Sequence, residues 1–186
     1  MKTSTQRRQL TLLLILATVL AGVPTTVCAQ NSHQPWSTVA TAGEPDESSQ
    51  ALVDYNGSSA YIKSSAPASS TVTIRYRVSP VDGLFFTSCK SLKVRFLDDG
   101  DAADIRIVLR QTNIDTGALS TPLTFNSVSF PGMRGFQTQY GLCVDFTFDF
   151  TVNTYYLEVV MTRSAGPHNV RGNVGLQIMQ ITTNLI

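Results

Sequence analysis

The chain has 186 residues, with 14 Lys and Arg against 13 Asp and Glu and a formal net charge of +1. A charge this close to zero excludes the strong basic excess that attracts nucleic acid or an anionic membrane surface. The length is sufficient for one domain with a substantial hydrophobic core.

Residues 1–29 predict a secretory signal peptide. Three basic residues precede an apolar run over 10–23, and Val27 and Ala29 occupy the −3 and −1 positions of a cleavage site. The run has about 14 residues, whereas a membrane-spanning helix needs about 20. We therefore expect this helix to be cleaved near Ala29, which leaves no membrane span and places the protein in the periplasm or outside the cell.

Cleavage changes both the charge and the cysteine count. The remaining chain has 11 basic and 13 acidic residues, a net charge of −2, and Cys28 is lost with the leader. Cys89 and Cys143 remain, and an even pair in an oxidising compartment predicts a disulfide. The histidines, His33 and His168, lie far apart in sequence, so they predict no metal site.

The segment after the leader predicts a flexible arm. Residues 30–50 are mostly polar, and Trp36 is their only large apolar side chain. Such a composition buries too little apolar surface to offset the entropy of ordering the chain. We therefore expect a flexible arm over 30–50, followed by a single domain over 51–186.

From about Leu52 onward, apolar and polar side chains alternate with the period of half-buried β-strands. The clearest segments are 71–78, 90–97, 104–111, 143–150, 154–162 and 175–181, with shorter candidates at 51–55, 60–63 and 119–125. Turn residues separate them, and no helical period follows the leader. These features predict an all-β fold in which two antiparallel sheets form a β-sandwich of jelly-roll type. In this architecture, though in no residue motif, the chain resembles small exported bacterial β-sandwich proteins and jelly-roll carbohydrate-binding modules.

Three carboxylates lie on the predicted hairpin 143–162. If the hairpin turns at Val152, Asp145, Asp149 and Glu158 share one outer face. A pair of carboxylates across a sugar is the arrangement that glycoside hydrolysis requires. The alternative is a solvated face on which these groups make cross-strand ion pairs with basic residues, and the sequence favours it.

A second acidic cluster lies in the turn 98–104. Asp98, Asp99, Asp101 and Asp104 could supply oxygen ligands to Ca²⁺, which takes six to eight of them. No Glu closes an EF-hand loop, and Gly100 is sufficient for an ordinary β-turn. Calcium is the one cofactor that the sequence allows as a hypothesis.

Residues 130–140 predict a loop rich in aromatic side chains. Phe130, Arg134, Phe136 and Tyr140 are the candidate ligand-binding residues, because aromatic and arginine side chains on sandwich loops commonly bind ligands. The alternative is that these aromatic rings cover the end of the core.

No serine-hydrolase, P-loop or dinucleotide motif is present, so no catalytic residue is assigned. The sequence favours a non-enzymatic exported protein that binds a glycan or another surface protein, or that has a structural role. A small hydrolase using the surface carboxylates and a fibre-type subunit that exchanges strands are the alternatives.

Overall fold

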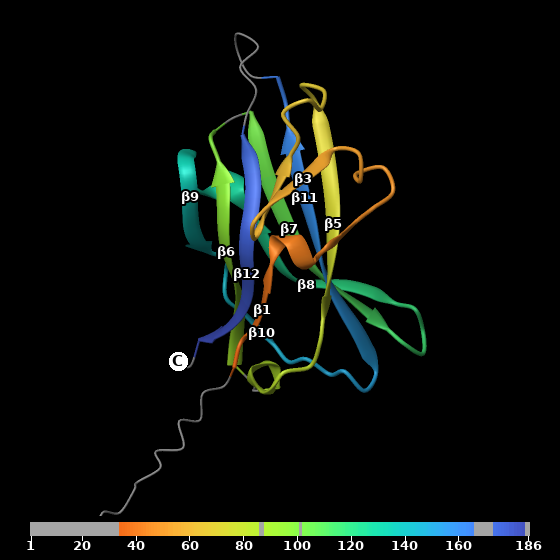
Figure 1. Cartoon of the computed structure of the whole chain (residues 1–186). Helices are drawn as coiled ribbons and strands as arrows, with labels where there is room; N and C mark the ends of the chain where they lie inside the picture. The colour runs from red at the N-terminus through yellow and green to blue at the C-terminus, as the bar shows by residue number, and fades with distance from the viewer. Residues whose placement is uncertain (1–33, 86–87, 101, 166–172, 185–186) are drawn as a thin grey trace, which may run out of the picture. The chain divides into compact units, whose positions relative to one another are not determined.

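Two antiparallel β-sheets pack on each other in the computed structural model, which describes residues 34–85, 88–100, 102–165 and 173–184 (Figure 1). These residues belong to one compact unit, His33–Ile186. Regular structure among them consists of strands and three short 3-10 turns, which confirms the predicted all-β sandwich. The leader predicted over 1–29 lies outside the described residues.

Sheet A has the order β10-β6-β12-β4-β3, and in addition β9 pairs with β6 and β1 with β12. Its strands are β1 (Trp36–Val39), β3 (Val53–Asn56), β4 (Ser59–Ile62), β6 (Ser88–Asp98), β9 (Met133–Tyr140), β10 (Val144–Phe146) and β12 (Val174–Asn184). Sheet B has the order β2-β5-β11-β7-β8. Its strands are β2 (Glu44–Pro45), β5 (Ser70–Val78), β7 (Ala103–Asn113), β8 (Leu119–Asn126) and β11 (Asn153–Arg163).

The core is built from the apolar residues of the alternating segments. Because side chains on a strand alternate between its two faces, one set points inward and the other toward solvent. The inward set forms a single cluster, which includes Val72, Ile74, Leu92, Val94, Phe96, Ile105, Ile107, Leu109, Leu157, Val159, Leu176 and Ile181. The alternation therefore predicted the inward faces of β5, β6, β7 and β11 correctly, whereas in β12 an irregularity between Leu176 and Ile178 interrupts it.

The N-terminal segment differs from the flexible arm expected over 30–50. β1 pairs with β12, β2 pairs with β5, and the side chains of Trp36 and Ala40 are buried in the core. The structure thus includes this part of the chain in both sheets. The polar composition of this segment gave no indication that it is ordered, because a single tryptophan ring contributes much of the apolar surface that the segment buries.

The segment 143–150 also differs from its prediction. Only Val144–Phe146 is a strand, and it pairs with β6 of sheet A, whereas β11 belongs to sheet B. The residues between them form no hairpin. Instead, the Phe148 and Phe150 rings pack on Tyr155, with centroid distances of 4.8 and 4.9 Å. Aromatic packing between the two sheets therefore replaces the expected strand pairing.

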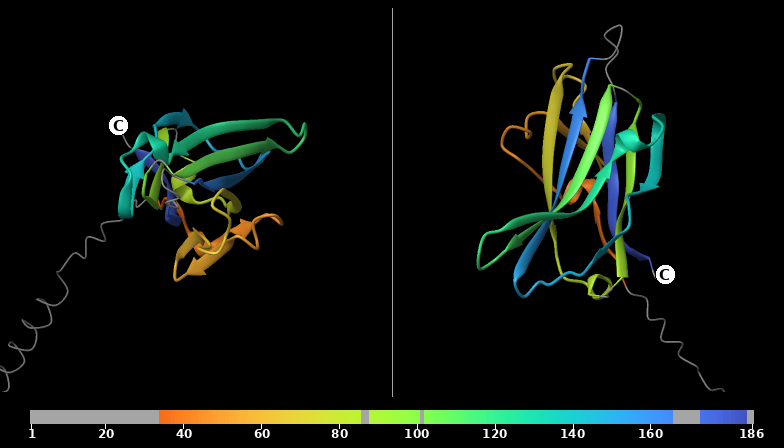
Figure 2. Two further views of the ribbon diagram at one scale, coloured as in Figure 1. Left: turned by 90° about the horizontal axis from the view of Figure 1, so that it is seen from above. Right: turned by 180° about the vertical axis from the view of Figure 1, so that it is seen from behind.

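One hairpin extends beyond the rest of sheet B. Figure 2 shows the β7–β8 turn projecting from the sandwich, and its Ile114 and Leu119 side chains are exposed. β8 is an edge strand that contains Pro122, a position that suits proline because proline cannot donate a backbone hydrogen bond to a neighbouring strand.

The predicted disulfide joins Cys89 of β6 to Cys143, which immediately precedes β10. The Cα atoms are 5.4 Å apart, inside the usual range for a disulfide. The bond fixes the start of β10 against β6 and closes a loop with a sequence separation of 54 residues.

Replacing both cysteines, as Cys89→Ala with Cys143→Ala, should lower the free energy of unfolding by about 4 kcal/mol, because the unfolded chain regains the entropy of the open loop. Equilibrium unfolding in urea measures this change, with reduced wild-type protein as the control. A loss below about 1 kcal/mol would show that the bond does not constrain the unfolded chain.

Candidate functional site

The outer face of sheet A carries a cluster of aromatic, cationic and amide side chains. Strand register brings them together from four strands, with β12 and β6 in the middle and β4 and β9 on either side. We refer to this cluster as the sheet A platform. It comprises Tyr61, Lys93, Arg95, Phe136, Thr138, Tyr140, Gln177 and Gln180.

The upper end of the platform is a pair of aromatic rings. Tyr61 comes from β4 and Phe136 from β9, and their ring centroids are 6.1 Å apart with an interplanar angle of 68°. Because β12 and β6 lie between their strands, the two side chains must lean toward each other across the sheet. Tyr61 also lines a pocket of about 250 Å³ with Leu97, Val174 and Arg163, so its ring borders a hollow.

Gly175 makes room for the Tyr61 ring. The residue lies opposite Tyr61 in the register of β12 and β4. A Cβ atom at this position would lie 2.6 and 2.8 Å from two carbons of that ring. Only glycine therefore allows the ring to lie against the backbone of β12.

Arg95 occupies the middle of the platform. Its Nε donates to Gln177 Oε1 at 2.5 Å, and its Nη1 makes a long hydrogen bond of 3.5 Å to Thr138 Oγ1. The guanidinium carbon lies 5.7 Å from the centroid of Phe136, within cation–π range. Contacts from β9 and β12 thus hold the guanidinium in one orientation over β6.

Lys93 and Tyr140 form the lower end. The Lys93 Nζ atom lies 5.6 Å from the Tyr140 ring centroid, and the register places Gln180 beside Lys93 on β12. Tyr140 keeps 53 % of its surface exposed. The platform therefore presents both an accessible ring and an ammonium group to solvent.

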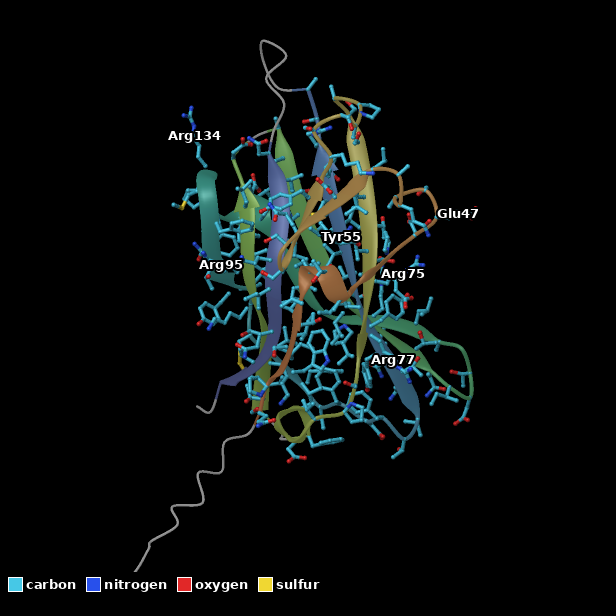
Figure 3. The ribbon with its side chains drawn as sticks, viewed as in Figure 1. Glu47, Tyr55, Arg75, Arg77, Arg95 and Arg134 are labelled. Carbon is cyan, nitrogen blue, oxygen red and sulfur yellow. A yellow bond between two sulfur atoms is a disulfide. The ribbon has the colours of Figure 1, made fainter. Side chains whose placement is uncertain are left out.

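The structure separates the four predicted ligand-binding residues. Phe136 and Tyr140 belong to the platform, and Arg134 is exposed near the start of β9 (Figure 3). Phe130 instead stacks on Phe125 at 5.4 Å and packs against the core. The segment expected to be a loop is, from Met133 on, strand β9, because its backbone pairs with β6.

Sequence reasoning missed Tyr61, Lys93, Arg95 and Gln177 as partners of these rings. The alternation in 90–97 puts Lys93 and Arg95 on the face opposite the apolar residues of that strand. What was missing was the strand order, which brings β4, β12, β6 and β9 next to one another. The periodicity within a strand carries no information about which strand lies beside it.

The three carboxylates of the hydrolase hypothesis do not meet. Asp145 lies on β10 of sheet A, and Glu158 lies on β11 of sheet B, paired with Arg110 at 2.8 Å and Arg75 at 3.8 Å. Asp149 accepts hydrogen bonds from Thr151, which lower the pKa of its carboxyl group. The acidic patch therefore does not form, and Glu158 makes the cross-strand ion pairs of the alternative interpretation.

In the described part of the calcium set, Asp98 and Asp104 share Ser127 as a partner, whereas Asp99 has a different one. The Asp98 carboxylate accepts from Ser127 Oγ and from the Gly100 backbone, whereas Asp99 accepts from Asn173 at 2.7 and 2.9 Å. Asp104 lies 3.3 Å from Ser127 Oγ. Asp101 lies outside the described residues, and the rest contain no group of three His, Cys, Asp or Glu that could hold a metal ion. Asp98, Asp104 and Phe130 line a pocket of about 180 Å³.

No family model matches the chain, and no curated protein sequence matches it significantly. Among solved structures, TmCBM61 in complex with β-1,4-galactotriose is 7 % identical over 81 % of this chain and 88 % of that one, with a TM-score of 0.40. The CBM36-1 domain of a xylanase from the hindgut metagenome of Trinervitermes trinervoides is 10 % identical over 82 % and 100 %, with a TM-score of 0.41. A family 30 carbohydrate-binding module of Clostridium thermocellum is 13 % identical over 82 % and 92 %, with a TM-score of 0.42. These scores are too low to say anything about the function of this chain, which must be inferred from its own surface.

None of the helical turns in the described part of the chain is long and apolar enough to cross a membrane.

The buried Asp98 should make stability depend on pH. Its side chain is only 4 % exposed, and burial raises the pKa of its carboxyl group above the ordinary value of 3.8. The folded state then binds the proton more tightly than the unfolded state, so the free energy of unfolding should fall as the pH rises above this value. Asp98→Asn cannot ionise and should lack this fall. Urea unfolding of both proteins at several pH values measures the difference, and a difference that does not vary with pH would contradict the assignment.

Proposed function

We propose that the protein is an exported, non-enzymatic glycan-binding protein whose ligand lies on the sheet A platform. The observation that supports this proposal best is the alternation of rings with planar hydrogen-bonding groups across four strands. Aromatic rings pack against the apolar faces of sugar rings, and guanidinium and amide groups exchange hydrogen bonds with hydroxyl groups.

The chemistry of the platform favours a glycan over a protein ligand. The core of a protein interface is depleted of lysine and acidic residues and enriched in aromatic residues, methionine and arginine. Here a lysine lies at the centre, and among the described residues the most exposed apolar side chains lie elsewhere: Leu142 at 85 %, Leu119 at 69 % and Val128 at 64 %. Of the other exposed apolar residues, Ile178 lies opposite Arg95 in the register, and Val39 lies opposite Ile178.

The disulfide supports export. Disulfides persist in oxidising compartments and are rare in the cytosol. The Cys89–Cys143 bond is therefore consistent with a protein that acts outside the cytoplasm. Within this proposal, residues 1–29 are the signal peptide that directs export and is then removed near Ala29.

Substitutions on the platform should weaken glycan binding selectively. Tyr61→Ala and Phe136→Ala each remove one stacking ring, and each should weaken binding by about tenfold or more. Binding is measured first on a glycan array and then by calorimetry with the strongest oligosaccharide. Tyr156→Ala, on the outer face of sheet B, is the matched control and should bind as the wild type does.

Circular dichroism and thermal unfolding confirm that each variant is folded. Absence of binding to every glycan would reject the proposed function. If Tyr156→Ala loses as much glycan binding as the two platform variants, the assignment of the binding face to sheet A would be rejected.

A further inference from the structure

We infer that the glycan bound on the sheet A platform is anionic and carries carboxylate or sulfate groups. This inference rests on the proposed function and specifies the class of ligand. It depends on the two cations at the centre of the platform and on what surrounds them.

Lys93 and Arg95 lie two residues apart on β6 and project from the same face of the sheet. Two residues of a strand span about 7 Å, so each cation can contact a different group of one ligand. Their contacts are neutral: a ring for Lys93, and a ring, an amide oxygen and a hydroxyl for Arg95. Neither side chain makes an ion pair with a carboxylate of the described residues.

The neighbouring positions in the sheet are neutral as well. The register places Tyr140 and Gln180 beside Lys93, and Thr138 and Ile178 beside Arg95. Acidic residues on this face lie at its margins, where Asp54 is opposite Tyr61 and Asp145 is opposite Cys89. The positive charge at the centre is therefore left uncompensated by the sheet.

On the outer face of sheet B, by contrast, arginine side chains pair with a carboxylate. Glu158 on the central strand β11 receives hydrogen bonds from Arg110 Nε and Nη2 and lies 3.8 Å from Arg75. Each of these two arginines therefore has a carboxylate partner, although they share it. On sheet B, a carboxylate on the central strand pairs with arginines from the neighbouring strands. On the platform, no carboxylate lies beside Lys93 or Arg95 in the register.

The free donors of the platform match an anionic sugar. Arg95 uses Nε and Nη1 within the protein, while its Nη2 makes no hydrogen bond to any described residue. Guanidinium groups bind carboxylates and related oxyanions with charge-assisted hydrogen bonds that are stronger than neutral ones. The adjacent Phe136 and Tyr140 rings can pack on the sugar ring that carries the anionic group.

The test uses an array that displays neutral glycans beside glycans bearing carboxylate or sulfate groups. The wild-type protein should bind members of the anionic set, and Lys93→Gln and Arg95→Gln should each weaken that binding by about tenfold or more. Arg77→Gln, which removes an exposed arginine on the other sheet (Figure 3), is the matched control and should have no effect. Raising the ionic strength from about 0.05 to 0.5 M should weaken binding further.

Four outcomes would overturn the inference. Strong binding to neutral glycans, unchanged in Lys93→Gln and Arg95→Gln, would reject the anionic ligand and leave the proposed function intact. Equal losses of binding in Arg77→Gln and Arg95→Gln would indicate nonspecific attraction between charges. Binding to DNA and polyglutamate as strong as binding to the anionic glycans would indicate the same. Binding to no glycan, while all variants remain folded, would reject the inference and the proposed function together.

Discussion

The pairing of β6 with β12 is the interaction on which the rest of the structure depends. It joins a strand from the middle of the chain to the last strand, and every other strand of sheet A except β3 pairs with one of these two. The inward residues of this pair, such as Phe96 and Leu176, lie at the centre of the core. Their outward neighbours, including Arg95 and Gln177, form the middle of the platform. One register therefore determines both the packing of the interior and the composition of the proposed binding face.

The charged side chains on the two outer faces of the sandwich have different partners. On sheet B, Glu158 lies between arginines from the two neighbouring strands, and the resulting ion pairs are partly shielded from solvent. On sheet A, the cations contact rings and amides instead. Exposed ion pairs stabilise a fold only slightly, so the difference says little about stability. It does show that Lys93 and Arg95 contact neutral groups, whereas Arg75 and Arg110 pair with Glu158.

The sequence predicted the inward faces of the long strands, the disulfide and the all-β class, because each follows from a local pattern or from a residue count. It failed where long-range packing decides the structure. Trp36 orders a segment whose composition is polar, and Phe148 and Phe150 leave the strand pattern to pack on Tyr155. For the platform, the sequence identified Phe136 and Tyr140 as candidates but missed Tyr61, which is about 75 residues earlier and reaches Phe136 only through the strand order. It also included Phe130, because an aromatic ring in a segment with no clear period carries no sign of whether it faces the core.

The most direct test of the central claim is an NMR titration of the isotopically labelled protein with the strongest glycan from the array. The binding face is then mapped without any substitution. If the platform is the site, the largest shift changes should fall on amides and side chains of β4, β6, β9 and β12, including those of Tyr61 and Arg95. Shift changes concentrated on β5, β7 and β11, or around the pocket beside Asp98, would contradict the account.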